Sequence, residues 1–259
     1  MKVSDIAHAD FIAGLAKGLA VLESFDIERQ RLNATLAAQR AGLTRAAARR
    51  HLLTLTHLGY LESDGQYFWL APKVLRLSGS YLASARLPRT VQPALHRLSQ
   101  MTGLSCSVAV LDGHEMVIVA RSSNSQPEIL RTVHGLHLGS RLPAHATSTG
   151  RIMLANLNDT ALEQWFAKYP LPRLTAYTVT SLQQLMSILY LVRQQDHALA
   201  CEEHEVGVQA IAVPLRDAHG NTLAALNAVS NPHKHTAKQL QRDILPLLQD
   251  AARELRPML

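Results

Sequence analysis

The sequence predicts a mixed α+β fold divided into two domains, and three observations support this prediction. The chain has 259 residues, enough for one large or two modest domains that each bury a core. Its excess positive charge lies early in the chain, because residues 29–61 and 65–111 contain basic residues and no Asp or Glu. The later part alternates predicted hairpins with helices, which is typical of an α+β domain with an antiparallel sheet. We therefore expect a DNA-facing domain over residues 9–71, a linker helix over 72–87 and a second domain over 88–259.

Composition excludes several classes of protein. Hydrophobic residues make up 47% of the chain and charged residues 18%, which indicates a folded globular protein. No apolar run approaches the roughly 20 residues needed to cross a bilayer, and the first residues lack a secretory apolar region. Two cysteines, Cys106 and Cys201, are too few for a disulfide framework. These features predict a cytoplasmic protein with no membrane partner.

In the first domain, apolar spacing predicts a helix over residues 11–25 and two shorter helices over 35–41 and 46–58. The stretch that follows, 59–70, has the pattern of a β-hairpin around Asp64-Gly65, a dipeptide that favours type I′ turns. Pro72 begins a further helix that extends to about residue 84. This order is that of a helix-turn-helix with a wing and a linker helix.

In the second domain, Pro88 and Pro93 indicate a connecting segment before the sheet begins. The elements expected after it are strands at 105–111 and 115–121, a weaker strand at 129–133, helices at 145–157, 159–168 and 181–195, a hairpin of 211–216 with 223–229, and a closing helix at 236–255. Paired hairpins with intervening helices leave room for a pocket between sheet and helices.

The candidate DNA-binding residues lie around the turn at 42–44. Thr44 is placed to cap the second helix of the pair, and arginines near that helix start suit base edges and phosphates. Small alanines there allow close approach to the groove, and the hairpin is expected to follow the phosphate backbone. The candidates are Thr35, Thr44, Arg45, Ala46, Arg49 and Arg50. An ordinary pair of helices with solvated arginines is the alternative.

Several separate motifs, in order along the chain, resemble those of IclR-family transcriptional regulators. They are AKGLAVLESF at 16–25, AGLTRAAARR at 41–50, LGYL at 58–61, LAPKVL at 70–75, GSRLPAHATSTGR at 139–151 and EEHEVGVQAIAVP at 202–214. The resemblance implies a winged helix-turn-helix, a linker helix and a GAF-like domain for a small-molecule effector. It also implies a homodimer or tetramer acting on double-stranded operator DNA, with RNA polymerase as a further candidate partner.

Residues 11–18 and 141–148 resemble the branch that includes PcaU, PcaR and PobR, which regulate breakdown of aromatic acids such as protocatechuate and 4-hydroxybenzoate. A glyoxylate- and pyruvate-responsive member carries an acid, a Cys and two Ser near Ala200 and at Ala210, Asn227 and Val229. Because this chain departs from all four, the resemblance argues against a small α-keto acid. An IclR-type sensor of a non-aromatic metabolite remains the alternative.

The expected pocket receives a carboxylate at the start of helix 145–157, where backbone N–H groups have no helical partner. Arg141 is a candidate for a bidentate ion pair, Asn227 for an amide contact with a ring hydroxyl, and Val108, Val110 and Leu154 for apolar walls. Each has a structural alternative, such as capping, bracing the fold or filling the core. The candidate ligand-binding residues are Arg141, Thr147, Ser148, Thr149, Gly150, Leu154, Ala210, Asn227 and Val229.

Other classes of site receive less support. Histidines at 134, 137 and 145, or at 233 and 235, lack a zinc-ligand spacing, so we expect no metal and no cofactor. A hydrolase with an accessory DNA-binding domain is a third alternative that would need Cys106 or Ser148 beside a base. Neither has a known nucleophile context, so we expect no catalytic residues.

Overall fold

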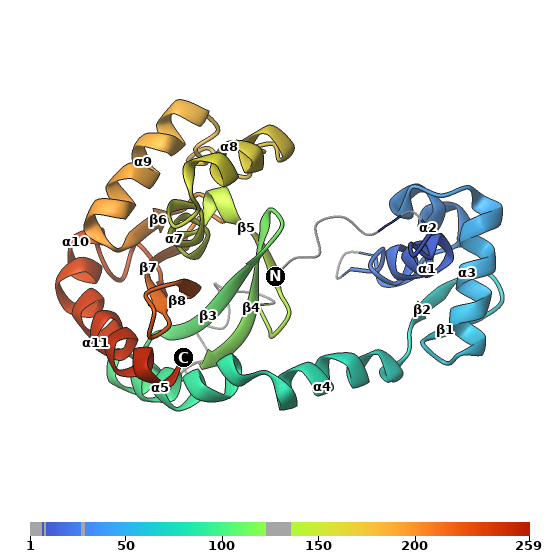
Figure 1. The fold of residues 1–259 in the computed structure, drawn as a ribbon, viewed down its shortest axis with the longest axis horizontal. Helices are drawn as coiled ribbons and strands as arrows, with labels where there is room; N and C mark the ends of the chain where they lie inside the picture. The colour runs from blue at the N-terminus through green and yellow to red at the C-terminus, as the bar shows by residue number, and fades with distance from the viewer. Residues whose placement is uncertain (1–6, 8, 27–28, 123–135) are drawn as a thin grey trace. The chain divides into compact units, whose positions relative to one another are not determined.

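The computed structural model describes residues 7, 9–26, 29–122 and 136–259. The described chain forms two compact units, Met1–Ala83 and Ser84–Leu259. Figure 1 shows the elements of each unit. The division falls inside the predicted linker segment 72–87. The weak strand predicted at 129–133 lies outside the described residues.

The first unit is a three-helix domain with a two-stranded sheet, as the sequence predicts. Its elements are α1 (Ala13–Leu22), α2 (Ala34–Ala41), α3 (Arg45–His57), β1 (Leu61–Ser63) and β2 (Phe68–Leu70). An apolar core joins all of them; it contains Val21, Phe25, Leu32, Leu52, Leu55, Leu61 and Phe68. Every element contributes to this core, α2 through Ala34 and Ala37, so the helix-turn-helix and the hairpin pack around one apolar cluster.

The turn between α2 and α3 is fixed by caps that the sequence carries locally. The Asn33 side chain accepts hydrogen bonds from the N–H groups of Thr35 and Leu36, and Thr44 Oγ1 accepts one from Ala47 N–H. Gly42 ends α2 with φ 66°, a left-handed conformation that glycine adopts without strain. The predicted cap at Thr44 is therefore confirmed.

The wing differs from its prediction in the turn. Ser63 pairs with Phe68, so the loop has four residues, not the two of a type I′ turn. The Asp64 carboxylate accepts hydrogen bonds from the N–H groups of Gln66 and Tyr67 and so organises the longer loop. An aspartate that satisfies the turn with its own side chain outweighs the preference of the Asp-Gly dipeptide.

Two helices follow the wing. After a 3₁₀ turn at Pro72–Val74, α4 covers Leu75–Ser84, and α5 covers Arg86–Thr102. Helix α5 was not predicted, because Pro88 and Pro93 are typical of a connecting segment. Pro88 lies in the first turn, where a missing N–H costs little, and the buried face of Val91, Leu95 and Leu98 offsets the interruption at Pro93.

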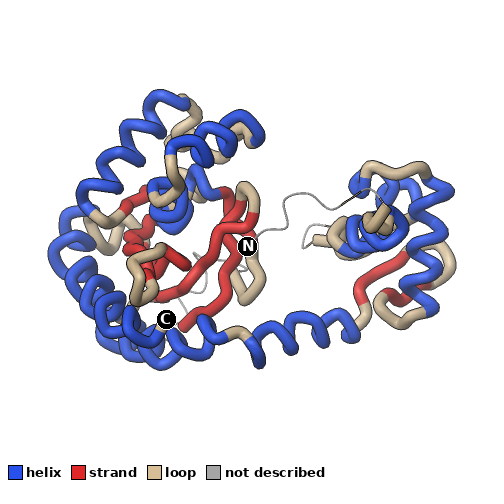
Figure 2. Tube along the Cα trace, in the orientation of Figure 1, coloured by secondary structure: helices blue, strands red, loops and turns tan. Residues whose placement is uncertain are grey.

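The second unit is built on a six-stranded antiparallel sheet of order β5-β4-β3-β8-β7-β6. The strands are β3 (Ser105–Asp112), β4 (Glu115–Ser122), β5 (Arg141–Pro143), β6 (Ala198–Cys201), β7 (Gln209–Arg216) and β8 (Thr222–Ser230). The two predicted hairpins form its centre, whereas the short outer strands β5 and β6 were not predicted. Figure 2 shows this sheet in red with helices around it.

Helices cover both faces of the sheet (Figure 1). One face packs against α5 and the C-terminal helix α11 (Leu245–Leu255), which continues from α10 (Ala237–Gln239) through a π-helical turn at Leu240–Ile244. The other face packs against α7 (Ser148–Ala155), α8 (Asp159–Lys168) and α9 (Leu182–Gln195). A 3₁₀ turn at Ala144–Ala146 precedes α7, so the helix predicted at 145–157 is shorter than expected. Within the described ranges, no helix combines the length and apolarity needed to cross a membrane.

Candidate nucleic-acid interface and ligand cavity

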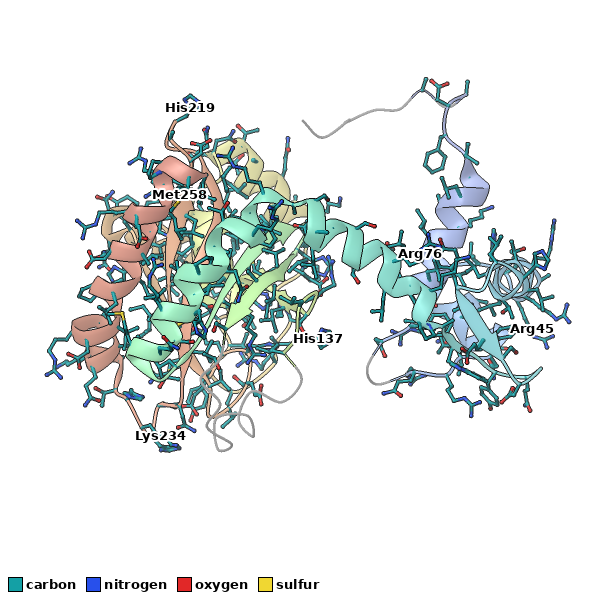
Figure 3. All side chains as sticks on the ribbon, turned by 90° about the horizontal axis from the view of Figure 1, so that it is seen from below. Arg45, Arg76, His137, His219, Lys234 and Met258 are labelled. Carbon is teal, nitrogen blue, oxygen red and sulfur yellow. The ribbon has the colours of Figure 1, made fainter. Side chains whose placement is uncertain are left out.

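The start of α3 presents an exposed basic surface. Arg45, Arg49 and Arg50 are exposed, and in the described part of the chain their side chains make no hydrogen bond or ion pair. Figure 3 shows Arg45 at the edge of its unit. The other predicted DNA-binding residues, Thr35, Thr44 and Ala46, are exposed as well. This helix end therefore keeps its cations available for an anionic partner.

Not every arginine of the acid-free segment stays unpaired. Arg40 forms an ion pair with Asp26, and Arg31 pairs with Asp64 at 2.9 Å and stacks 4.3 Å above the Trp69 ring. The acids that neutralise them lie just beyond the segment in sequence. The wing strands and turn, residues 61–70, carry two acids and no Lys or Arg. If the wing lies along the DNA backbone, its own residues supply no cation for the phosphates, and Arg31 would have to supply one.

In the second unit, a partly enclosed cavity lies between the sheet and α7. Cross-strand register brings its sheet wall together, since Ser107 pairs with Asn227, and Ala210 pairs with both Val229 and Ala200. Small side chains at these inward positions leave space that larger ones would fill. The lining residues are Ser107, Ala109, Ile118, Leu136, Leu142, Ala146, Thr147, Ser148, Thr149, Ala200, Glu203, His204, Glu205, Val208, Ala210, Asn227 and Val229.

The start of α7 supplies one end of this cavity. Thr147 caps the helix, because its Oγ1 accepts a hydrogen bond from Gly150 N–H and donates one to the Pro143 carbonyl. The N–H groups of Ser148 and Thr149 have no partner inside the helix, since they are the first helical residues. Such groups attract an anion at the positive end of the helix dipole. The cap therefore leaves two of the expected backbone donors for a ligand.

Asn227 lines the cavity from β8, but part of its amide is already in use. Ser107 Oγ donates a 2.6 Å hydrogen bond to Asn227 Oδ1. This bond fixes the amide so that Oδ1 accepts and Nδ2 is the group left to donate. A ligand oxygen near Asn227 would accordingly be an acceptor.

A buried ion pair lies beside the cavity. The Arg151 guanidinium donates to Glu203 Oε2 at 2.6 Å and to the Leu199 carbonyl at 2.9 Å. Val179 N–H donates to the same carboxylate at 3.3 Å. The two charged side chains are only 4% and 9% exposed. The pair therefore fixes the loop before β7 against the first turns of α7.

Two histidines belong to the segments next to this ion pair, His204 to the loop after Glu203 and His145 to the turn before α7. Burial lowers the pKa of His204, and the nearby Glu205 carboxylate opposes that shift. Burial also lowers the pKa of His145, whose Nε2 lies 3.0 Å from the Pro172 carbonyl oxygen. His204 lines the cavity and was not among the predicted ligand-binding residues. A loop histidine has no periodicity, and only its place in the motif at 202–214 singled it out.

Three predicted ligand-binding residues do not line the cavity. Arg141 is exposed on the edge strand β5, where it forms ion pairs with Asp112 at 2.7 Å and Glu115 at 2.6 Å. Leu154 belongs to the core between α7 and the sheet. A Cβ atom on Gly150 would meet the Ala144 carbonyl oxygen at 2.0 Å, so this glycine permits close packing behind the cavity.

The predicted apolar walls Val108 and Val110 are also placed differently. Both pack with the core on the opposite face of the sheet, because alternate residues of a strand face opposite ways. Ala109 and Ile118 form the corresponding wall of the cavity. By contrast, Thr147, Ser148, Thr149, Ala210, Asn227 and Val229 are brought together in the cavity as expected.

The residues considered for other chemistry lie apart from any catalytic grouping in the described chain. Burial raises the pKa of the Cys106 thiol to about 12, which keeps it protonated. Ser148 Oγ has no hydrogen-bond partner among the described residues, so no base activates it there. The same residues contain no group of three His, Cys, Asp or Glu side chains arranged to hold a metal, and His134 lies outside them.

A winged helix-turn-helix with unpaired arginines, together with a second unit that has a pocket between its sheet and helices, defines a ligand-responsive DNA-binding protein. Residues 14–65 match the IclR helix-turn-helix domain, and residues 79–256 match the bacterial transcriptional regulator IclR C-terminal domain. The chain belongs to the IclR family of transcriptional regulators.

The chain is also similar to individual members of this family. The chain is 52% identical over 254 residues to the Pca operon regulatory protein of Acinetobacter baylyi, covering 98% of this chain and 91% of the relative. It is 51% identical over 253 residues to the p-hydroxybenzoate hydroxylase transcriptional activator of the same organism, covering 97% and 93%. A Microbacterium hydrocarbonoxydans IclR homolog solved with 4-hydroxybenzoate is 27% identical, with a TM-score of 0.74 over 94% of this chain and 98% of that one.

Proposed function

We propose that this regulator controls genes for the breakdown of aromatic acids and takes a hydroxybenzoate-type monocarboxylate as its effector. The observation that carries the proposal is the cavity, which combines α7 backbone donors with an apolar sheet wall. The two Acinetobacter relatives are named for regulation of aromatic-acid genes, and the Microbacterium homolog holds 4-hydroxybenzoate. Action on operator DNA would take place in the cytoplasm.

In this proposal, the carboxylate lies at the start of α7, near the N–H groups of Ser148 and Thr149. The ring lies against Ala109, Ala210 and Ile118, whose side chains offer apolar surface. Asn227 Nδ2 then donates to the ring hydroxyl oxygen, because Oδ1 is held by Ser107. Arg141 has no part in this arrangement.

The DNA-binding step places α3 of each protomer in a major groove, with Arg45, Arg49 and Arg50 toward bases and phosphates. We propose a dimer because α4 exposes Leu75, Leu77 and Tyr81, at 69%, 58% and 48%. Sedimentation at micromolar concentration should give a dimer or tetramer, and a monomer there would exclude this assembly.

The effector would control DNA binding by favouring one of two arrangements of the DNA-binding domains. It can do so only if it binds the protein more tightly in one arrangement than in the other. RNA polymerase remains a predicted partner.

Calorimetry with the full chain tests the effector. We expect 4-hydroxybenzoate or protocatechuate to bind and phenol to lose most of the affinity, because the N–H groups of α7 would lose their acceptor at about 1–3 kcal/mol each. Glyoxylate and pyruvate serve as the non-aromatic comparison. Equal affinity for 4-hydroxybenzoate and phenol, or binding of the keto acids alone, would exclude the proposal.

A further inference from the structure

Two buried polar atoms in the cavity lack a partner. Ser148 Oγ and His204 Nδ1 are both inaccessible and have no hydrogen-bond partner in the described part of the chain. Both residues line the cavity, and Ser148 as a whole is only 1% exposed. Buried polar atoms are nearly always paired, and an unpaired one marks a place where another molecule can supply the partner. Here two such atoms belong to the same cavity.

The ion pair beside the cavity joins the two segments that carry these residues. Glu203 precedes His204 directly, and its carboxylate is bound by Arg151, which follows Ser148 on the first turn of α7. Arg151 also donates to the Leu199 carbonyl of β6, so its guanidinium joins α7 both to this strand and to the loop that follows it.

We infer that His204 and Ser148 form a single receptor for the carboxylate of the effector, with Ser148 Oγ–H and a protonated His204 imidazole both donating to it. The inference rests on the proposed function, because it assigns the charged group of that effector. His204 supplies the cationic charge that the cavity otherwise lacks, since no Lys or Arg is among its described lining residues. Arg151 is already bound to Glu203.

The charges around His204 determine how it responds to the ligand. Burial lowers its pKa, Glu205 raises it, Glu203 is engaged by Arg151, and His145 is itself a buried imidazole of lowered pKa. His204 is therefore neutral in the empty cavity near neutral pH. A bound carboxylate favours the imidazolium and raises the pKa of His204, so binding takes up a proton from solvent. Affinity should then fall as pH rises, by up to about tenfold per pH unit while that proton is lost.

Calorimetry of the full chain in phosphate and in Tris, buffers with different ionisation enthalpies, measures this proton. With 4-hydroxybenzoate or benzoate near pH 7, we expect the wild-type protein to take up as much as about one proton per ligand. His204→Gln should abolish the uptake, flatten the pH dependence of affinity and weaken binding about tenfold. Ser148→Ala should weaken binding but keep the uptake.

Matched controls separate a receptor from general damage. His219→Gln changes an exposed histidine on the β7–β8 loop (labelled in Figure 3) and should behave as wild type. Thermal unfolding and operator binding check the folding of each variant, and the pH series on the wild-type protein needs no variant at all.

The outcomes are distinct. Wild-type binding of aromatic acids without proton uptake, or uptake that persists in His204→Gln, would overturn the inference and leave the proposed function standing. Uptake of the same size with phenol, which has no carboxylate, would also overturn it. If no aromatic acid binds, both the carboxylate receptor and the proposed function are excluded.

Discussion

The two units hold their functional residues in opposite ways. The arginines of α3 lie exposed within six residues of one helix, whereas the cavity is assembled from segments between residues 107 and 229 and is largely buried. An exposed site is altered at little cost to the fold, because its side chains make few contacts. A buried site shares its residues with the core, so changes there affect stability and binding together.

Breaking the buried ion pair should have the largest effect. Arg151→Met leaves Glu203 charged and uncompensated, and we expect a loss of about 3–5 kcal/mol in the free energy of unfolding. Arg97→Ala removes the exposed ion pair with Glu254 and should cost about 0–1 kcal/mol. Denaturant unfolding measures both. Equal losses would show that the cavity side of the second unit is no more tightly constrained than its surface.

Gly150→Ala tests the close packing behind the cavity. Because the new Cβ would meet Ala144 backbone atoms at 2.0–2.4 Å, the helix start must shift. We expect a loss of about 3 kcal/mol in unfolding free energy and a loss of ligand affinity. Gly14→Ala, where nothing lies within 4 Å, is the matched control and should be neutral or slightly stabilising. An unchanged Gly150→Ala protein would mean that the helix start can move freely.

The exposed site should show the reverse behaviour. Arg49→Ala is expected to weaken binding to a cognate operator by about 1–3 kcal/mol and to change unfolding free energy by less than about 0.5 kcal/mol. Fluorescence anisotropy with specific and random DNA, at several salt concentrations, measures the first quantity. Equal weakening on both DNAs would assign Arg49 to phosphates and not to bases.

Acid should act on the second unit in a graded way. His145 and His204 have pKa values lowered by burial, so the unfolded chain binds more protons than the folded one as pH falls below about 6.5. Stability contributed by the neutral imidazoles is present above that pH and declines as pH falls toward their folded-state pKa values. In the double variant His145→Gln/His204→Gln, the free energy of unfolding should depend less on pH than in the wild-type protein. Identical pH profiles for variant and wild type would contradict this.

How far the sequence could predict each site follows from the range of the contacts that make it. The cap at Thr44 and the exposed arginines depend on residues a few positions apart, and local pattern is enough for both. Helix α5 was missed because Pro88 and Pro93 were weighed above the apolar spacing of Val91, Leu95 and Leu98. The prolines disfavour a helix and the apolar spacing favours one. Only the packing of the apolar face against the sheet decides between them.

The cavity depends on contacts that no local pattern specifies. Asn227 could be singled out from its strand, but its bond to Ser107 spans 120 residues and depends on the register of β3 with β8. Arg141 attracted a ligand role by its charge, and its partners Asp112 and Glu115 are set by the pairing of β5 with β4. The charge of Arg141 predicts an acidic partner, and the strand pairing decides that this partner is Asp112 and Glu115 and not a ligand.

The smallest expected effect concerns the wing, where the exposed unit departs from a simple basic surface. Asp64 places a negative charge at the turn and neutralises Arg31, while its carboxylate organises the loop through Gln66 and Tyr67 N–H. Those hydrogen bonds hold its pKa below the usual value, so it is charged at neutral pH. Asp64→Asn keeps an acceptor for the loop and frees Arg31 for a phosphate. We expect nonspecific DNA binding to tighten about two- to threefold and its salt dependence to steepen by about one phosphate contact. Glu62→Gln, on the same hairpin beside Trp69, controls for the loss of any acid. If Asp64→Asn and Glu62→Gln change the salt dependence equally, the change in net charge explains the effect and Arg31 makes no specific phosphate contact.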